Sequence, residues 1–234
     1  MDVNNIKALV FDVFGTVVDW RTSIASEAKQ CLSKKGYELD WVLFADSWRA
    51  KYQPAMEKVR TGGRGFVRLD ILHMENLIEV LKDFDIKSVT ETELNYLNRA
   101  WHRLLPWPDS VPGLLRLKKK FIIGTMSNGN VALMVNMAKN GDLPWDVILG
   151  AEPAQAYKPE PKTYLTGVDW LNLKPSEVLM CAAHNADLVA AGAQGLKTAF
   201  IARPTEYGPN QKHDFEAEHD FDYISENILD LADK

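Results

Sequence analysis

Five short, almost continuously apolar runs alternate with segments of helical spacing along this chain. The runs are IKALVFDV (6–13), KFIIGTM (120–126), DVILG (146–150), EVLMCAA (177–183) and KTAFIA (197–202). Their length and their β-branched and aromatic content are typical of strands covered on both faces of a parallel sheet. Five such strands alternating with helices predict an α/β protein with a Rossmann-like, doubly wound parallel sheet.

A different pattern fills the stretch between the first and second strands, where no strand signal is found. Four long segments have helical spacing there, at residues 22–36, 41–60, 66–84 and 90–105. Glycine- and proline-rich turns separate them, at Gly36, GGRG (62–65) and PWPDSVPG (106–113). We therefore expect an inserted helical cap domain at residues 18–107 and a core domain formed by residues 1–17 and 108–234.

The rest of the core is expected to be simpler. The polar stretch at residues 203–222 is typical of a long surface loop, and a terminal helix is expected near residues 225–232. In doubly wound sheets, ligands bind outside the carboxyl ends of the strands, near a switch in strand order. Polar residues that follow the strands are therefore the candidates for chemistry.

Composition narrows the function classes. The 234 residues include 27 Lys and Arg against 32 Asp and Glu, which gives a net charge of −5. With no run of five basic residues, nothing in the charge pattern favours nucleic acid or an anionic membrane surface as a partner. No apolar stretch approaches the length of a spanning helix and no secretory signal opens the chain, so a cytoplasmic protein is expected. The distant Cys31 and Cys181 are expected to be free thiols.

Asp12 ends the first buried strand and is followed by Val-Phe-Gly-Thr. A carboxylate at such a turn can act as a nucleophile, with Gly15 allowing a tight backbone and exposed N–H groups nearby. The alternative is a turn carboxylate that backbone amides satisfy. Position alone leaves both interpretations open.

Ser127, Asn128 and Lys158 follow later strands. Ser127 and Asn128 lead into an expected helix through Gly129, where they can cap the helix, bind an anion at its N-terminus, or do both. Lys158 lies in YKPEPKTY, whose prolines would fix its direction. An isolated lysine is usually solvated, but one beside a nucleophilic carboxylate would keep that carboxylate ionised.

The segment CAAHNADLVAAGAQG runs from the fourth strand into a helix rich in small residues. His184, Asn185 and Asp187 could form a hydrogen-bonded group that activates water. Alternatively, Asn185 caps the helix and Asp187 is favoured in its first turn by the helix dipole. In the expected cap, Arg49 of SWRAKY could reach an anionic ligand, although a surface position is commoner for arginine.

With these positions in order, the sequence resembles the haloacid dehalogenase superfamily and, within it, the type II 2-haloacid dehalogenases. The resemblance covers nearly the whole chain. It is carried by FDVFGT (11–16), MSNG (126–129), YKPEPKTY (157–164) and Asp187 ahead of AAGAQG. Each motif is weak alone, but their order and spacing after successive strands are specific for the superfamily.

The choice within the superfamily rests on absent acids. Its phosphatases carry a second aspartate two positions after the nucleophile, where this chain has Phe14. They also hold Mg²⁺, a cation that prefers carboxylate oxygens, with closely spaced acids near the last motif. Here Ala182, Ala183 and His184 stand at that place, and only Asp187 is acidic. The resemblance therefore implies a metal-independent, cofactor-free dehalogenase.

The resemblance implies hydrolytic dehalogenation of small 2-haloacids such as haloacetates and L-2-halopropionates. Asp12 would displace halide in line, with inversion, and form an aspartyl ester that water then hydrolyses. Near-attack positioning and stabilisation of the departing halide would supply the rate. Members of the family are often dimers, so a homodimer is one expectation, although no sequence feature sets the oligomeric state.

The resemblance also implies individual roles. Thr16 would orient the nucleophile, Lys158 would position it, and Asp187 would activate water. Arg49 and Asn128 would bind halide, and Ser127, with backbone N–H groups after Asp12, would hold the substrate carboxylate. The remaining residues expected in the substrate site are Val13, Phe14, Trp48, Phe66 and Tyr164.

One departure concerns the last motif. The type II pattern has Ser and Asn there with an aromatic residue next to the Asp, whereas this chain reads AAHNAD. His184 stands at the family's Asn position, so it is a candidate to assist the hydrolytic water together with Asn185, or to contact substrate or halide. This substitution and the Trp content suggest a pocket for very small acids, including fluoroacetate. The alternatives are a Mg²⁺-dependent phosphatase of a small metabolite and a silent binding protein on the same fold.

Overall fold

The computed structural model describes residues 5–234 and contains a six-stranded sheet whose strands pair in parallel. Its strands are β1 (Ala8–Phe11), β4 (Ile122–Ser127), β5 (Val147–Gly150), β6 (Val178–Ala182), β7 (Lys197–Ile201) and β8 (Tyr223–Ser225). They lie in the order β5-β4-β1-β6-β7-β8. The predicted doubly wound α/β core is confirmed, with each of the five expected strands present.

Within the six-stranded sheet, the strand that the sequence did not predict is β8. It has three residues, YIS, and pairs with β7 at the edge of the sheet, with Ala199 beside Tyr223. Three residues inside a polar stretch give too short a pattern to distinguish a strand from a loop. The terminal helix α11 (Ile228–Asp233) follows, close to its expected place.

Helices cover both faces of the sheet. They are α6 (Ser110–Leu117), α7 (Val131–Asn140), α8 (Ala151–Ala154), α9 (Pro161–Trp170) and α10 (Asn185–Gly192), with α11 at the end of the chain. Alternate residues of β1 belong to different hydrophobic clusters. Leu9 and Phe11 pack in one cluster, and Ala8 and Val10 pack in the other. This two-residue alternation is expected of a strand buried on both faces.

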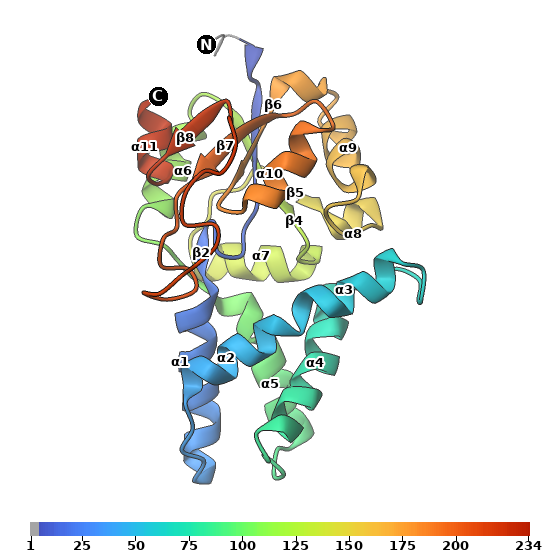
Figure 1. Ribbon diagram of the computed structural model, residues 1–234, viewed down its shortest axis with the longest axis vertical. Coiled ribbons are helices and arrows are strands. Elements are labelled where there is room, and N and C mark those ends of the chain that lie inside the picture. The colour runs from blue at the N-terminus through green and yellow to red at the C-terminus, as the bar shows by residue number, and fades with distance from the viewer. Residues whose placement is uncertain (1–4) are drawn as a thin grey trace.

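The inserted helices form a separate layer beside the sheet (Figure 1). They are α1 (Trp20–Leu32), α2 (Trp41–Ala50), α3 (Tyr52–Arg60), α4 (Leu69–Asp83) and α5 (Glu91–Asn98), continued by a 3₁₀ turn, η3 (Arg99–Arg103). The expected helix at residues 41–60 is in fact two helices. Pro54 lies in the first turn of α3, where its missing N–H is tolerated, but it could not continue α2 without losing a hydrogen bond.

Local chemistry begins several of these helices. Asp40 accepts hydrogen bonds from two backbone N–H groups at the start of α2, and Thr90 and Glu93 form a capping box at the start of α5. Such caps satisfy donors that have no partner inside the helix. Capping side chains therefore stabilise the helices of the cap domain, in addition to the burial of their apolar faces.

A short ribbon marks the two crossings between the layers. Strand β2 (Val18–Asp19) pairs antiparallel with β3 (Leu105–Pro106), so that the chain leaves the sheet and returns to it at the same place. We propose this ribbon as the domain limit, which agrees with residues 18–107 as the cap. The inserted layer then lies over the ends of the strands, where the candidate residues gather.

Candidate active site

The carboxyl ends of three neighbouring strands bring the candidate residues together. Asp12 directly follows β1, Ser127 ends β4 and His184 lies just beyond β6. Because β1 pairs in parallel with both β4 and β6, these ends meet at the same edge of the sheet. The chain crosses from one half of the sheet to the other here, which is the place where such sheets bind ligands.

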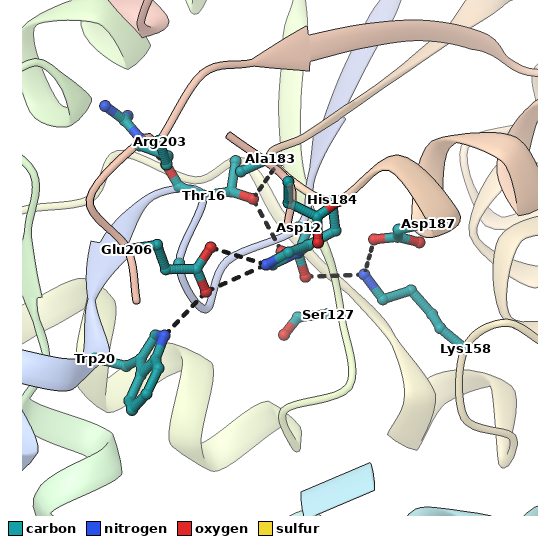
Figure 2. Close-up of polar contacts among 12 residues, drawn as sticks. Asp12, Thr16, Trp20, Ser127, Lys158, Ala183, His184, Asp187, Arg203 and Glu206 are labelled. Carbon is teal, nitrogen blue, oxygen red and sulfur yellow. Dashed lines mark hydrogen bonds and ion pairs between the residues drawn. The ribbon is translucent and has the colours of Figure 1, made fainter. Parts of the chain in front are cut away.

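Asp12 is 6% exposed, and three side chains donate hydrogen bonds to it (Figure 2). The Nζ atom of Lys158 lies 2.9 Å from Oδ1, while the Oγ1 of Thr16 and the Nδ1 of His184 lie 2.9 and 3.0 Å from Oδ2. Burial alone would raise the pKa of Asp12, but the charges of Lys158 and His184 and their hydrogen bonds hold it well below its ordinary value. Asp12 is therefore an ionised, buried carboxylate.

Lys158 bridges two carboxylates. Its ammonium contacts Asp187 as well as Asp12, and the hydroxyl of Tyr164 donates to Asp187 at 2.6 Å. Burial would lower the pKa of Lys158, but the two carboxylates raise it, so the lysine is charged. Burial and the nearby Asp12 raise the pKa of Asp187 above its usual range, although the charge of Lys158 lowers it. The raised pKa makes Asp187 a better proton acceptor.

His184 lies between two carboxylates. Its Nδ1 faces Asp12 and its Nε2 lies 3.0 Å from the Oε2 of Glu206, whose Oε1 accepts a hydrogen bond from Trp20 at 2.9 Å. Burial would lower the pKa of His184, but Glu206 and Asp12 raise it well above its ordinary value. Burial would raise the pKa of Glu206, but the charge of His184 holds it below its usual range. The ring is therefore an imidazolium.

The loop after Asp12 is braced from the other side. The Nε of Arg203 donates to the carbonyl of Thr16 at 2.8 Å, and its other nitrogens form two 2.8 Å bonds with Asp109. Gly15 has a φ of +85°, and the carboxylate of Glu206 occupies the place where a Cβ would lie. Glycine is thus required both by the turn and by the approach of Glu206.

A cavity of about 370 Å³ opens beside these groups. Eight predicted residues line it: Asp12, Phe14, Arg49, Asn128, Lys158, Tyr164, His184 and Asp187. Six further residues complete its wall: Tyr52, Gln53, Pro159, Ala186, Tyr207 and Asp214. The cavity can hold a small anion, because three charged basic side chains, Arg49, Lys158 and His184, and the amide of Asn128 line it.

Arg49 reaches the cavity from the cap. It is partly buried, its guanidinium carbon lies 4.1 Å from the centre of the Tyr52 ring, and its buried Nε has no hydrogen-bond partner within residues 5–234. Buried donors normally have partners. An anion in the cavity would supply one, so Arg49 is a candidate for binding a halide or carboxylate.

A family model described as haloacid dehalogenase-like hydrolase matches residues 6–193. The chain belongs to this family. The curated (S)-2-haloacid dehalogenase 1 of Pseudomonas sp. (strain CBS-3) is 31% identical to it over 208 residues, which are 86% of this chain and 88% of that protein. The resemblance predicted from the motifs is confirmed.

Two solved structures of the haloacid dehalogenase-like family are closely similar. The defluorinating L-2-haloacid dehalogenase Rha0230 is 50% identical, with a TM-score of 0.96 over 97% of this chain and 94% of that one. The L-2-haloacid dehalogenase PA0810 is 45% identical, with a TM-score of 0.94 over 97% of each chain. Both the sheet and the cap are therefore shared with members of this family.

Two expected cavity walls lie elsewhere. The Nε1 of buried Trp48 donates to the carbonyl of His73 at 3.0 Å, and Phe66 packs on Tyr157 with ring centres 5.2 Å apart. Neither is among the cavity-lining residues in the described part of the chain, so the expectation that they form its wall is wrong. Trp48 lies on the face of α2 that packs into the cap, and Tyr52 of α3 supplies an aromatic wall instead.

The expected helix after Ser127 begins later than predicted. Helix α7 starts at Val131, with Asn130 at its N-cap, so capping by Ser127 or Asn128 is wrong. Instead, the Oγ of Ser127 accepts from the N–H of Gly129 at 3.1 Å, and the Oδ1 of Asn128 accepts from the N–H of Lys158 at 2.9 Å. Asn128 therefore fixes the backbone of Lys158 while it lines the cavity.

The remaining predicted residues support the cavity from behind. Val13 is fully buried in the loop after Asp12. Asn185 opens helix α10, and its side-chain amide donates to Asp214 and to the carbonyl of Glu216, each at 3.0 Å. Asn185 thus ties down the polar stretch that the sequence predicted to be a surface loop.

The sequence did not point to Glu206, whose carboxylate contacts His184. It lies in that same polar stretch but is only 1% exposed, so the prediction of a surface loop is wrong for this part of it. The local sequence, RPTEYGP, is typical of an exposed loop. The signal that could have pointed to a partner was His184, a histidine at a strand end beside an expected nucleophile.

No helix formed by residues 5–234 combines the length and the apolar character that a membrane span requires.

Proposed function

We propose that the protein hydrolyses small 2-haloacids to 2-hydroxyacids through an aspartyl ester on Asp12, without a metal. The observation that carries the proposal is the ionised, buried Asp12, held by Lys158, Thr16 and His184 beside a small cavity that Arg49 lines from the cap. The names of the relatives, (S)- and L-2-haloacid dehalogenases, support it.

In the first step, an oxygen of Asp12 attacks the halogen-bearing carbon, the new C–O bond forms, and the C–halogen bond breaks with inversion. Arg49 and Asn128 line the cavity and would stabilise the departing halide. Ser127 and the backbone N–H groups of Val13 and Phe14 would hold the substrate carboxylate. Holding the carboxylate and the nucleophile together supplies the positioning that this step needs.

In the second step, water attacks the ester at Cγ of Asp12, which releases the hydroxyacid and restores the carboxylate. Asp187 would accept the water proton because its pKa is raised. Tyr164 and Lys158 hold Asp187 in place through hydrogen bonds.

The chemistry of the site favours an ammonium over a divalent cation. Lys158 contacts both Asp12 and Asp187, so its charge lies between the two carboxylates of the site. Phe14 supplies an apolar wall where the phosphatases of the superfamily carry their second acid. These features support the dehalogenase over the Mg²⁺-dependent phosphatase.

We further propose that very small acids, including fluoroacetate, are the preferred substrates. Phe14 and Tyr52 narrow the cavity with aromatic rings, and Arg49 and His184 add positive charge beside it. The name of Rha0230, a defluorinating enzyme, agrees with this proposal. Steady-state comparison of fluoroacetate, chloroacetate and 2-chloropropionate tests it, and a preference for bulkier haloacids would overturn it.

The main test is halide release in the presence of EDTA. Chloroacetate, fluoroacetate and each enantiomer of 2-chloropropionate are offered to the wild type and to Asp12→Asn. The proposal predicts release by the wild type alone, and the L-enantiomer of 2-chloropropionate as the better substrate. Absence of release together with Mg²⁺-dependent hydrolysis of a phosphate ester would reject it, and anion binding without turnover would indicate a binding protein.

A further inference from the structure

The two oxygens of Asp12 have different surroundings. Oδ2 accepts hydrogen bonds from both Thr16 and His184, whereas Oδ1 accepts one, from Lys158. A carboxylate oxygen has two in-plane lone pairs, so both are engaged on Oδ2 and one is free on Oδ1. Oδ1 is therefore the oxygen that can attack, and Oδ2 becomes the carbonyl oxygen of the ester.

The His184 ring must carry two hydrogens to fit its surroundings. Its Nδ1 faces an oxygen of Asp12 and its Nε2 faces both oxygens of Glu206, at 3.2 and 3.0 Å. Carboxylate oxygens only accept hydrogen bonds, so each ring nitrogen has to donate. Because Asp12 and Glu206 are both ionised, with pKa values below their ordinary ones, this geometry specifies an imidazolium pointing at Oδ2.

We propose that His184 and Thr16 form the oxyanion-stabilising pair for hydrolysis of the aspartyl ester, and that Glu206 is the positioning residue that keeps His184 aimed at Oδ2. This inference rests on the proposed function and adds the assignment of its second step. Preorganised donors aimed at the atom where negative charge develops are the arrangement that stabilises such intermediates.

The step balances as follows. The water oxygen bonds to Cγ, one water proton passes to Asp187, and the carbonyl electron pair moves onto Oδ2 between the N–H of His184 and the O–H of Thr16. The pair then returns, the Cγ–Oδ1 bond breaks, and the departing alkoxide takes a proton from Lys158. Lys158 regains a proton from Asp187, and the second water proton leaves when the new Asp12 carboxyl ionises.

The position of His184 beside Oδ2 gives it different effects on ester formation and on ester hydrolysis. A cation on Oδ2 withdraws charge from the attacking carboxylate, so it does not accelerate displacement of halide. The same cation faces full negative charge only in the tetrahedral intermediate. Loss of His184 or Glu206 should therefore slow hydrolysis of the ester much more than its formation.

The pH dependence of this step depends on all groups that face His184. Asp12 and Glu206 contact the ring. The other charged or titratable side chains of the same cavity are Arg49, Tyr52, Lys158, Tyr164, Asp187, Tyr207 and Asp214. Only Glu206 combines direct contact with a position away from the reacting atoms, so its removal isolates the effect on His184.

The test is a rapid-quench experiment with chloroacetate, in which released chloride and the mass of the intact protein are followed together. Glu206→Gln and His184→Asn are compared with the wild type, and Glu226→Gln, an exposed glutamate in the same C-terminal part, is the matched control. We expect both site variants to release about one chloride per enzyme rapidly and to accumulate the ester. Their ester hydrolysis should fall by about 10²-fold, the usual loss for one oxyanion donor.

A pH profile separates positioning from a merely structural effect. In Glu206→Gln, the alkaline limb of ester hydrolysis should move to lower pH, because the histidine loses one of its two carboxylates; Glu226→Gln should keep the wild-type limb. His184→Asn carries the test alone should Glu206→Gln not fold. Equal slowing of the chloride burst and of ester hydrolysis, without accumulated ester, would overturn the inference. A wild type that forms no ester and releases no chloride would reject the proposed function itself.

Discussion

The ammonium of Lys158 lies 2.9 Å from the Oδ1 of Asp12, although 146 residues separate them in the chain. Both side chains are more than nine-tenths buried. A buried charge without a partner is costly, so each residue depends on the other for its ionisation. Their pairing makes Asp12 available as a nucleophile.

Replacing this lysine should therefore change the pH dependence as well as the rate. Lys158 lowers the pKa of Asp12, so in Lys158→Met that pKa should rise and the acid limb of kcat/KM should move to higher pH. The rate at its optimum should fall by at least about 10²-fold, from loss of positioning. Lys162→Met, a nearby lysine on the exposed side of α9, is the control. An unmoved acid limb would show that another group ionises Asp12.

Thr16 holds two partners at once. Its hydroxyl donates to Asp12 and accepts from the N–H of Ala183, each at 2.9 Å. Thr16→Val keeps the shape but leaves both partners unsatisfied, which should cost about 1–3 kcal/mol of unfolding free energy. Activity should fall by about 10-fold or more, since hydrogen bonds to charged groups contribute about 1.5–3 kcal/mol. Thr16→Ser, which retains the hydroxyl, should recover most of the lost stability and most of the lost activity. Urea unfolding measures the stability, and halide release measures the activity.

Arg49 should contribute most to the rate when the departing halide is a poor leaving group. Its Nε is buried without a hydrogen-bond partner in the described chain, beside the cavity. If it stabilises the departing halide, Arg49→Lys should reduce kcat on fluoroacetate more than on chloroacetate, because fluoride depends more on hydrogen-bond donors as it leaves. Arg116→Lys, at an exposed position on α6, serves as the comparison. An equal loss on both substrates would assign Arg49 to substrate binding instead.

The His184–Glu206 ion pair should stabilise the folded protein most strongly within a limited pH range. The pKa of Glu206 is lowered, so its contribution is complete above 4.5 and is lost as the pH falls through the folded value. The pKa of His184 is raised, so its contribution is complete below 6.5 and is lost as the pH rises through the folded value. The wild type should therefore be more stable than the double variant His184→Asn/Glu206→Gln, and the difference in unfolding free energy should be largest between pH 4.5 and 6.5. Urea unfolding at several pH values measures the difference, and a flat difference would contradict the assigned charges.

Much of the site could be predicted because it follows from strand ends. Asp12, Ser127 and His184 each follow a buried apolar run, and a parallel sheet places such ends together. The motif order then identified Lys158 and Asp187, which lie in loops and helices but at fixed spacings from those strands. The helical cap could be predicted from periodicity alone.

The rest depends on packing that local sequence does not encode. Trp48 and Arg49 are neighbours on α2, yet only Arg49 faces the cavity, because the direction of each side chain depends on how the cap is seated on the core. Glu206 looks like a loop residue, and its burial follows from Gly15, Trp20 and His184, which come from distant parts of the chain. Such residues become visible only when the tertiary structure is known.

The most direct test of the account is a single turnover in ¹⁸O-labelled water, with enzyme in excess over chloroacetate and EDTA present. Because water attacks Cγ of Asp12 and not the substrate carbon, the label should appear in the Asp12 carboxylate, and the glycolate from the first turnover should be unlabelled. Peptide mass spectrometry locates the label. Label in the glycolate, with none at Asp12, would show direct attack by water and would contradict the nucleophilic role of Asp12.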